Sequence, residues 1–287
     1  MTAGQAHSQP GEVDLHMHST ASDGALAPSA VVAAARDAGL AAIALTDHDT
    51  LAGLQEAELA AEPFGIRVVP GVELSAHDGA SEIHLLALHI ADREKIEHHL
   101  VRFRDDRLIR AQNIVERLKG LGIDVALETV LQEAGGGAVG RPHVARALIR
   151  GGHVRDSREA FDRFLGAGKP GFIPKARLEI AEAIELAHAA GAIAIWAHPG
   201  QEGRRECVES FAKLGLDGIE IKHPSHYPDD VKRLTALTDF FGLVPSGGSD
   251  WHGSREGPRT IGSMHVPPAW LHQQDVLVAR RRAAEVA

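Results

Sequence analysis

Short apolar runs alternate with longer segments of helical periodicity along most of the 287-residue chain. The short runs are typical of buried strands, and the segments in which apolar residues recur three or four apart are typical of helices. We expect strands at 13–16, 41–46, 67–74, 82–90, 192–198, 218–222 and 243–250, and helices at 28–40, 50–65, 178–190, 203–214 and 228–241. Alternating strands and helices indicate a largely parallel sheet with right-handed crossovers.

The number of these units bears on the fold class. About seven strand–helix units favour an α/β barrel that closes on itself over an open, doubly wound sheet. No glycine-rich dinucleotide fingerprint follows the first strand, which also weakens the open-sheet alternative.

Residues 93 to about 175 interrupt the alternation. A long helical stretch at 94–122 is followed by shorter helical patterns near 125–134, 142–151 and 157–165, without a clear strand pattern. We therefore predict that 12–92 and 176–287 form the barrel, and that 93–175 is a small helical insertion covering the active site.

Composition narrows the class of protein. An apolar fraction of 44% with 24% charged residues is ordinary for a soluble globular chain, and Cys207, the single cysteine, excludes an intrachain disulfide and favours a reducing, cytoplasmic setting. The N-terminus lacks a secretory signal pattern, and no apolar run reaches the ~18 residues of a membrane span, so we expect no membrane association. The formal net charge of −9 argues against broad, nonspecific nucleic-acid binding.

Histidines and carboxylates cluster where the predicted strands end. The carboxyl ends of parallel strands share one face of a barrel, where active sites are built. Side chains two apart on a strand point the same way, as with His16 and His18. We therefore expect the following residues to approach one another: His16, His18, Asp47, His48, Asp49, Glu73, His84, His198, His223, His226, Asp250 and His252.

Imidazole and carboxylate groups without thiolates suit Mn²⁺, Zn²⁺ or Fe²⁺. Nine candidate ligands, eight of these residues and Asp23 after the first strand, are enough for two or three ions with positions left for water and substrate. Three divalent ions carry six positive charges, against three negative charges from Asp23, Glu73 and Asp250. Such a site favours an anion, with a phosphate ester as the natural candidate, and lowers the pKa of a bound water.

The motifs resemble the polymerase and histidinol phosphatase (PHP) family. They are "DLHMHS" with "SDG", then "LTDHD", "GVE", "EIHLL", "AHPG" and "GSDWH", and they span residues 14 to 252. The resemblance implies a distorted (β/α)7, TIM-like barrel with a trinuclear metal centre that hydrolyses phosphoesters. It implies two or three divalent ions per chain, with Mn²⁺ preferred over Zn²⁺ or Fe²⁺.

The same resemblance assigns ligands by position. One ion takes His16, His18, Glu73 and Asp250; a second shares Glu73 and takes His84 and His198; a third takes Asp23, His48 and His252. Many family members have histidine where this chain has Asp23. The substitution keeps a ligand and adds negative charge at the third ion.

Two further segments, "GRPHVARAL" at 140–148 and "GKPGFIPK" at 168–175, together with the insertion and the "SDG" motif, resemble one subgroup. It comprises nucleoside 3′,5′-bisphosphate phosphatases and includes the 5′-to-3′ exonuclease RNase AM. The resemblance implies that the substrate is adenosine 3′,5′-bisphosphate, cleaved to AMP and phosphate, or the 5′ end of a short oligonucleotide.

Cationic residues of the insertion are the substrate-binding candidates. They are Arg107, Arg110, Arg141, His143 and Lys175, with Arg104 at the same three-residue spacing on the long helix. An arginine fork suits a phosphate held away from the reacting one, which would explain a bisphosphate preference. The alternatives are a solvated helix face paired with nearby carboxylates, and a plain helix start at 141–143.

The expected mechanism is in-line attack on phosphorus by a hydroxide that bridges two ions, without a covalent enzyme intermediate. The leaving alcohol needs a proton. His226, His143 or a water on the third ion, held by Asp23, are the open alternatives. His226 is thus a catalytic or substrate-binding candidate, although His223 and His226 also suit a role in capping a loop.

Three rival functions follow from the same residues. A histidinol-phosphate phosphatase would not need the insertion. An amidohydrolase-type enzyme often has a bridging lysine, but here Glu73 holds that position and Lys222 is the lysine at a strand end. A non-catalytic, metal-stabilised module would be expected to lose ligands, whereas this chain keeps all nine. We expect no obligate protein partner.

Overall fold

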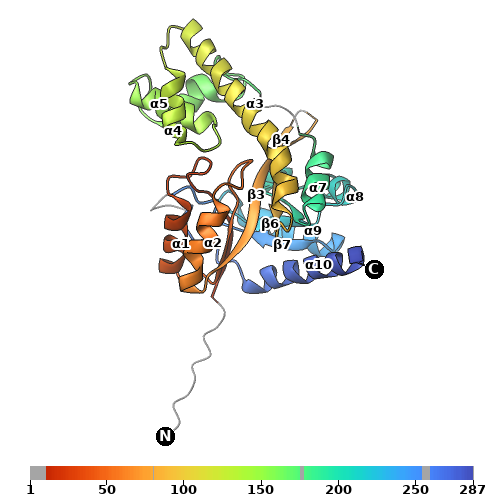
Figure 1. Cartoon of the computed structure of the whole chain (residues 1–287). Helices are drawn as coiled ribbons and strands as arrows, with labels where there is room; N and C mark the ends of the chain where they lie inside the picture. Colours follow the sequence, from red (N-terminus) through yellow and green to blue (C-terminus); the bar gives the residue numbers. More distant parts are fainter. Residues whose placement is uncertain (1–10, 80, 175–177, 254–258, 287) are drawn as a thin grey trace.

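The computed structural model describes residues 11–79, 81–174, 178–253 and 259–286. Seven strands form one sheet in the order of the chain (Figure 1). They are β1 (Val13–Met17), β2 (Ala42–Leu45), β3 (Arg67–Asp78), β4 (Ser81–Leu88), β5 (Ile193–Trp196), β6 (Gly218–Lys222) and β7 (Val244–Gly247). The predicted seven-stranded α/β barrel is confirmed.

The sheet curls until its first and last strands nearly meet. Met17 forms a parallel bridge with Trp251, and the backbone nitrogen of His18 donates to the Trp251 carbonyl at 2.9 Å. A Cβ on Gly248 would lie 2.4 Å from the backbone nitrogen of His16, so only glycine permits this approach. The chain that follows β7 is thereby held beside the end of β1.

The sheet is largely parallel, as predicted, and β4 is the exception. This strand runs antiparallel to both β3 and β5, whereas the other four pairs are parallel. β3 extends to Asp78 and β4 begins at Ser81, so the connection has two residues, and a parallel crossover needs a dozen or more. Gly79 has φ +57°, as a tight hairpin turn requires.

Helices cover the outside of the barrel. They are α1 (Pro28–Asp37), α2 (Leu54–Ala61), α7 (Ile180–Ala189), α8 (Arg205–Lys213), α9 (Pro228–Phe241) and α10 (Pro268–Val286), with short 3-10 turns η1 (Glu62–Phe64) and η3 (Gly200–Glu202). Proline begins α1, where its fixed φ suits the first helical position. In the described ranges, no helix combines the length and apolar character needed to cross a membrane.

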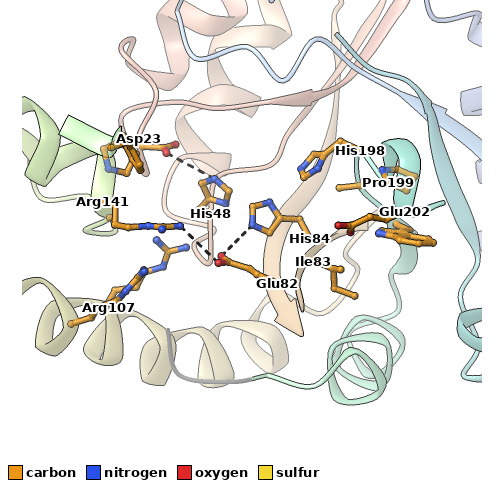
Figure 2. A pocket seen from close by; sticks show the side chains of 16 residues that line it. Asp23, His48, Glu82, Ile83, His84, Arg107, Arg141, His198, Pro199 and Glu202 are labelled. Carbon is orange, nitrogen blue, oxygen red and sulfur yellow. Dashed lines mark ion pairs between the residues drawn. The ribbon is translucent and has the colours of Figure 1, made fainter. Parts of the chain in front are cut away.

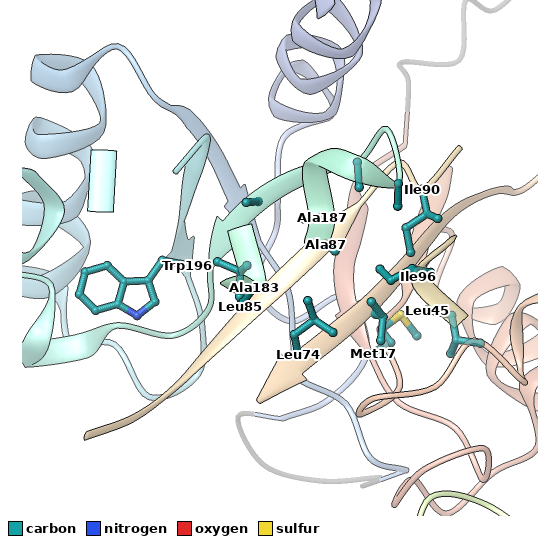
Figure 3. Packing of buried hydrophobic residues seen from close by; sticks show 14 of the residues in the cluster. Met17, Leu45, Leu74, Leu85, Ala87, Ile90, Ile96, Ala183, Ala187 and Trp196 are labelled. Atoms are coloured by element: carbon teal, nitrogen blue, oxygen red, sulfur yellow. The ribbon is translucent and has the colours of Figure 1, made fainter. Parts of the chain in front are cut away.

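The strands are buried on both faces, which explains their nearly continuous apolar runs. On β4, Leu85 and Ala87 pack in the larger cluster that includes residues of α7, as Figure 3 shows. The intervening Leu86 and Leu88 belong to a second cluster that includes residues of α10. Successive side chains of a strand thus fill two different cores.

The helices between β4 and α7 form a unit with its own core. They are α3 (Arg93–Gly120), α4 (Leu127–Ala134), α5 (Arg141–Arg150), α6 (Ser157–Ala160) and the π-helical turn η2 (Phe161–Leu165). The start of α3 packs on the barrel through Ile96 and Leu100, and its end joins a separate cluster with α4 and α5 (Figure 1). The later helices of this segment thus have a core separate from that of the barrel, and the boundaries at 93 and 175 stay a prediction.

Candidate metal centre

The structure brings all nine predicted metal ligands to one face of the barrel. Three groups have ligand atoms within 4.8 Å of one another: His16, His18, Glu73 and Asp250; His48, Glu73 and His84; and His18, Asp23, His48 and His252. His198 joins them, because its Nε2 lies 3.0 Å from Oε1 of Glu73. His84 reaches this face from the first half of β4, since that strand runs opposite to its neighbours.

Glu73 lies at the centre of these groups. Its carboxylate contacts five imidazoles: Oε2 lies 3.3 Å from His16 Nε2 and 3.2 Å from both His18 Nε2 and His48 Nδ1, and Oε1 lies 2.6 Å from His84 Nδ1 and 3.0 Å from His198 Nε2. Asp250 closes one side, with Oδ1 at 3.2 Å from His18 Nε2. One carboxylate shared by several imidazoles is the arrangement expected of a bridging ligand.

The chemistry of these atoms fits divalent cations. Several buried atoms of the centre make no hydrogen bond within the described part of the chain: His16 Nε2, both ring nitrogens of His18, His48 Nδ1 and Glu73 Oε2. Burying polar atoms without partners is costly. Because imidazole nitrogens and carboxylate oxygens converge here, ions such as Mn²⁺ or Zn²⁺ would satisfy them.

Mutual interactions set the charges of the centre. Burial raises the pKa of Glu73, but His48, His84 and His16 outweigh this and hold it well below its usual value. Burial lowers the pKa of His48 to about 3, against the opposing effects of Glu73 and Asp23. For His18, burial is outweighed by Asp250 and Glu73, which raise its pKa to about 10. A cation held by His18 would have to displace a proton from that ring.

Glu220, which is not among the residues predicted from the sequence, contacts one of the proposed ligands. It is fully buried on β6; its Oε1 lies 3.0 Å from His16 Nδ1, and its Oε2 accepts the backbone N–H of His198 at 2.7 Å. The carboxylate orients His16 so that Nε2 faces Glu73, as outer carboxylates do for metal-binding histidines. The available signal was a single carboxylate inside the buried run "GIEIK".

Replacing Glu220 with glutamine is expected to weaken Mn²⁺ affinity by about 10–100-fold, because His16 loses the carboxylate that fixes its ring. Titration with a competing chelator measures this affinity. Glu206→Gln, an exposed glutamate of α8, is the control. An affinity for Glu220→Gln equal to that of the control would show that His16 does not depend on Glu220.

The two aspartates that flank His48 hold neighbouring segments. Asp47 accepts hydrogen bonds from Ser19 N, Ser19 Oγ and Ser22 Oγ, each at 2.7 Å. Asp49 accepts from the backbone nitrogen of Ser75 at 3.1 Å and from Nε of Arg107 at 2.8 Å. These side chains shape the loops around the centre, and His48 between them faces Glu73.

His223 and His226 occupy different positions. His223 is buried, with Nε2 at 3.3 Å from Oδ2 of Asp250 and Nδ1 at 2.7 Å from Ser225 Oγ. His226 donates from Nδ1 to the Ile221 carbonyl at 2.8 Å and accepts the Gly200 N–H at Nε2 at 3.0 Å. Because both its nitrogens bind backbone groups, His226 is better suited to pinning a loop than to the predicted proton transfer.

A cavity of about 370 Å³ joins the centre to the insertion (Figure 2). Its lining includes Asp23, His48, His84 and His198 from the centre, Glu82 from β4, and Arg107, Arg110 and Arg141 from the insertion. Figure 2 shows Glu82 between Arg141 and His84, at 3.8 Å and 3.7 Å respectively. Anionic and cationic groups therefore line the cavity together.

The arginines of this cavity differ in their partners. Arg107 forms a buried ion pair with Asp49. Arg110 is buried and donates from Nε to the Ile173 carbonyl at 2.7 Å, but its Nη2 lacks a hydrogen-bond partner in the described ranges. Burial, with repulsion from Arg141, lowers the pKa of Arg110 to about 10. A buried guanidinium without its own carboxylate favours a bound anion.

Two predicted substrate contacts remain, His143 and Lys175, and the structure describes the first of them. His143 is fully buried where the insertion meets the barrel. Lys175 lies outside the described residues, as does the side chain of Arg104.

Known proteins resemble this chain in sequence and in fold. The PHP domain model matches residues 14–124. A relative from Chromobacterium violaceum, named 3′,5′-nucleoside bisphosphate phosphatase, is 36% identical over 264 residues, covering 89% of this chain and 93% of the relative. The 5′-3′ exoribonuclease Rnm of Escherichia coli K12 is 36% identical over 247 residues, covering 83% and 84% respectively.

A solved structure from Bifidobacterium adolescentis, described as a metal-dependent phosphoesterase, superposes with a TM-score of 0.85 at 31% identity, over 91% of this chain and 94% of that one. The sequence, the fold and the histidines and carboxylates around Glu73 therefore all indicate the same family. The chain belongs to the PHP family of metal-dependent phosphoesterases.

Proposed function

We propose that this protein removes the 3′-phosphate from nucleoside 3′,5′-bisphosphates, converting adenosine 3′,5′-bisphosphate to AMP and phosphate, and that it also acts on short 5′-phosphorylated oligonucleotides. One observation carries the proposal. A single cavity joins the centre around Glu73 to a group of arginines that includes the buried, incompletely paired Arg110. Such a cavity can hold one phosphate at each end.

The names of the relatives fit one chemical event. Removing a 3′-phosphate from a bisphosphate and removing the first nucleotide of a 5′-phosphorylated strand both break the bond between phosphorus and a 3′ oxygen. In both cases the nucleotide that carries this oxygen also carries a 5′-phosphate. We place the 5′-phosphate at Arg110 and Arg141 and the scissile phosphorus beside Glu73.

The residues of the chain divide the work. Divalent ions held by the nine ligands would activate the attacking water and neutralise charge on the phosphoryl group. Arg110 and Arg141 bind the distant phosphate, which fixes the orientation of the reacting ester. The insertion, which we propose covers the site, limits access of bulk water.

The leaving 3′ oxygen must gain a proton. Burial raises the pKa of Asp23, but His48 and His252 hold it well below its usual value. Asp23 is therefore ionised and suited to orienting a water near His252 Nε2, 3.2 Å from its carboxylate, rather than donating a proton itself. We propose that such a water, and not His226, supplies the proton.

We further propose two or three ions per chain, with Mn²⁺ preferred because oxygen and imidazole ligands are mixed. Zn²⁺ and Fe²⁺ are the alternatives. The single cysteine supports a cytoplasmic location. The proposed metal ligands and phosphate-binding arginines all come from this chain, so we propose that no protein partner is required.

A comparison of three substrates tests the proposal. With Mn²⁺-loaded protein, kcat/KM is expected to be highest for adenosine 3′,5′-bisphosphate, lower for adenosine 3′-phosphate and lowest for histidinol phosphate, because only the first has a second phosphate for the arginines. Chelation of the metal should abolish all three activities. Fastest turnover of histidinol phosphate would favour the rival phosphatase, and no turnover of any substrate would favour a non-catalytic module.

A further inference from the structure

The insertion touches two of the three barrel segments that carry the proposed ligands of the third ion, those of Asp23 and His48. Asp23 lies in the loop after β1, and His48 lies just after β2. Neither segment is part of the insertion, yet the backbone of the insertion contacts the first, and the side chain of Arg107 holds the second. These two contacts are separate in sequence and in chemistry.

The first contact is backbone against backbone. The nitrogen of Ala138 donates to the carbonyl of Ala21 at 3.0 Å. A Cβ on Gly137 would lie 2.6 Å from the carbonyl oxygen of Thr20, so the chain between α4 and α5 lies directly on this loop. The loop that carries Asp23 is thus enclosed between the barrel and the insertion.

His143 completes the first contact. It is fully buried, and its Nδ1 accepts the N–H of Gly140 at 2.8 Å, which leaves the proton on Nε2. Burial and repulsion from Arg146 lower its pKa to about 4, while Asp23 and the backbone of Ser22 oppose this shift. The ring lies close enough to the Ser22–Asp23 segment for both residues to influence its pKa, and its buried Nε2 makes no hydrogen bond in the described part of the chain.

The second contact is the buried ion pair between Arg107 and Asp49. The arginine is 7% exposed and the aspartate 4%, and Nε lies 2.8 Å from Oδ2. Asp49 has φ +52°, a left-handed conformation that costs energy and persists only where the surroundings fix it. Because His48 directly precedes it, the guanidinium of α3 fixes the backbone from which that ligand projects.

We infer that the helical insertion completes the third-ion site, with His143 and Arg107 as positioning residues that hold the segments of Asp23 and His48 in place. The inference rests on the ligand assignment within the proposed function. It gives the insertion a second task besides binding phosphate.

Metal stoichiometry tests the inference without relying on activity. The full chain, His143→Ala and Arg107→Lys are loaded at a series of Mn²⁺ concentrations, desalted and measured by mass spectrometry of the metal. Lysine keeps the positive charge near Asp49 but loses the planar fork. His153→Ala, a histidine of the insertion whose Nε2 instead contacts the Asp124 carbonyl at 3.1 Å, is the matched control.

The wild type and His153→Ala are expected to hold three ions. Both positioning variants are expected to hold two, with the third recovered only at about 10–100-fold higher Mn²⁺. Thermal unfolding of the metal-free proteins separates selective loss of the third ion from misfolding. A general loss of structure would remove all ions together. That general loss in both variants, or three ions bound with unchanged affinity, would overturn the inference.

The result also separates this inference from the proposed function. A wild type that holds only two ions but hydrolyses adenosine 3′,5′-bisphosphate would overturn the inference and leave the function standing. Three ions in the wild type, two in the variants and no turnover of the bisphosphate would support the inference and overturn the proposed substrate.

Discussion

Replacing Glu73 with glutamine is expected to reduce kcat/KM by about 10³-fold or more. The carboxylate contacts five imidazoles and is present in two of the three ligand groups, so its charge is needed by more than one ion. Losing about 4 kcal/mol of stabilisation of the transition-state charge corresponds to this factor. Steady-state kinetics with saturating Mn²⁺ measures the loss of turnover. Metal analysis of the same sample measures any loss of bound ions.

Glu128→Gln, an exposed glutamate of α4, is the control for the loss of one negative charge. Circular dichroism of both variants shows whether the barrel still folds. A folded Glu73→Gln protein with turnover within tenfold of the wild type would mean that Glu73 is not a bridging ligand.

Replacing Arg110 with alanine is expected to lower kcat/KM for adenosine 3′,5′-bisphosphate by about 10–150-fold, because a charged hydrogen bond to a phosphate contributes about 1.5–3 kcal/mol. Adenosine 3′-phosphate lacks the second phosphate, so its kcat/KM should change by less than about threefold on the same reasoning. Initial rates with both substrates give the ratio directly.

Arg117 provides a closely matched control. It lies on the same helix and donates to the carbonyl of Phe172 at 2.7 Å, as Arg110 does to that of Ile173, but it is exposed. Arg117→Ala should leave the substrate ratio unchanged. Equal losses on both substrates in Arg110→Ala would show that Arg110 supports the fold or the reacting centre and not the distant phosphate.

The convergence of the proposed metal ligands was predictable because strand ends of a barrel share one face. His16, His48 and Asp250 each follow or end an apolar run, so their convergence needs only the order of strands. His84 converges as well, although β4 is antiparallel, because reversing that strand brings its first half to the same face. The turn at Asp78 and Gly79 was the signal for this reversal.

Other features depend on contacts between distant parts of the chain. Glu220 and His16 are 204 residues apart, so nothing near either residue shows that they meet. Arg107 was expected on a phosphate-binding face, but its pairing with Asp49, 58 residues away, depends on how α3 crosses the barrel. His226 was a candidate acid by residue type, and only the positions of the Gly200 and Ile221 backbone show that its nitrogens are engaged.

Identification of the product from adenosine 3′,5′-bisphosphate tests the central claim most directly. The account predicts that Mn²⁺-loaded protein releases phosphate and adenosine 5′-phosphate, resolved from the 3′ isomer by ion-exchange chromatography, because the arginines bind the 5′-phosphate while the 3′ ester is cleaved. Release of adenosine 3′-phosphate would contradict the orientation. No reaction with the bisphosphate, alongside hydrolysis of histidinol phosphate, would contradict the proposed role of the insertion in choosing the substrate.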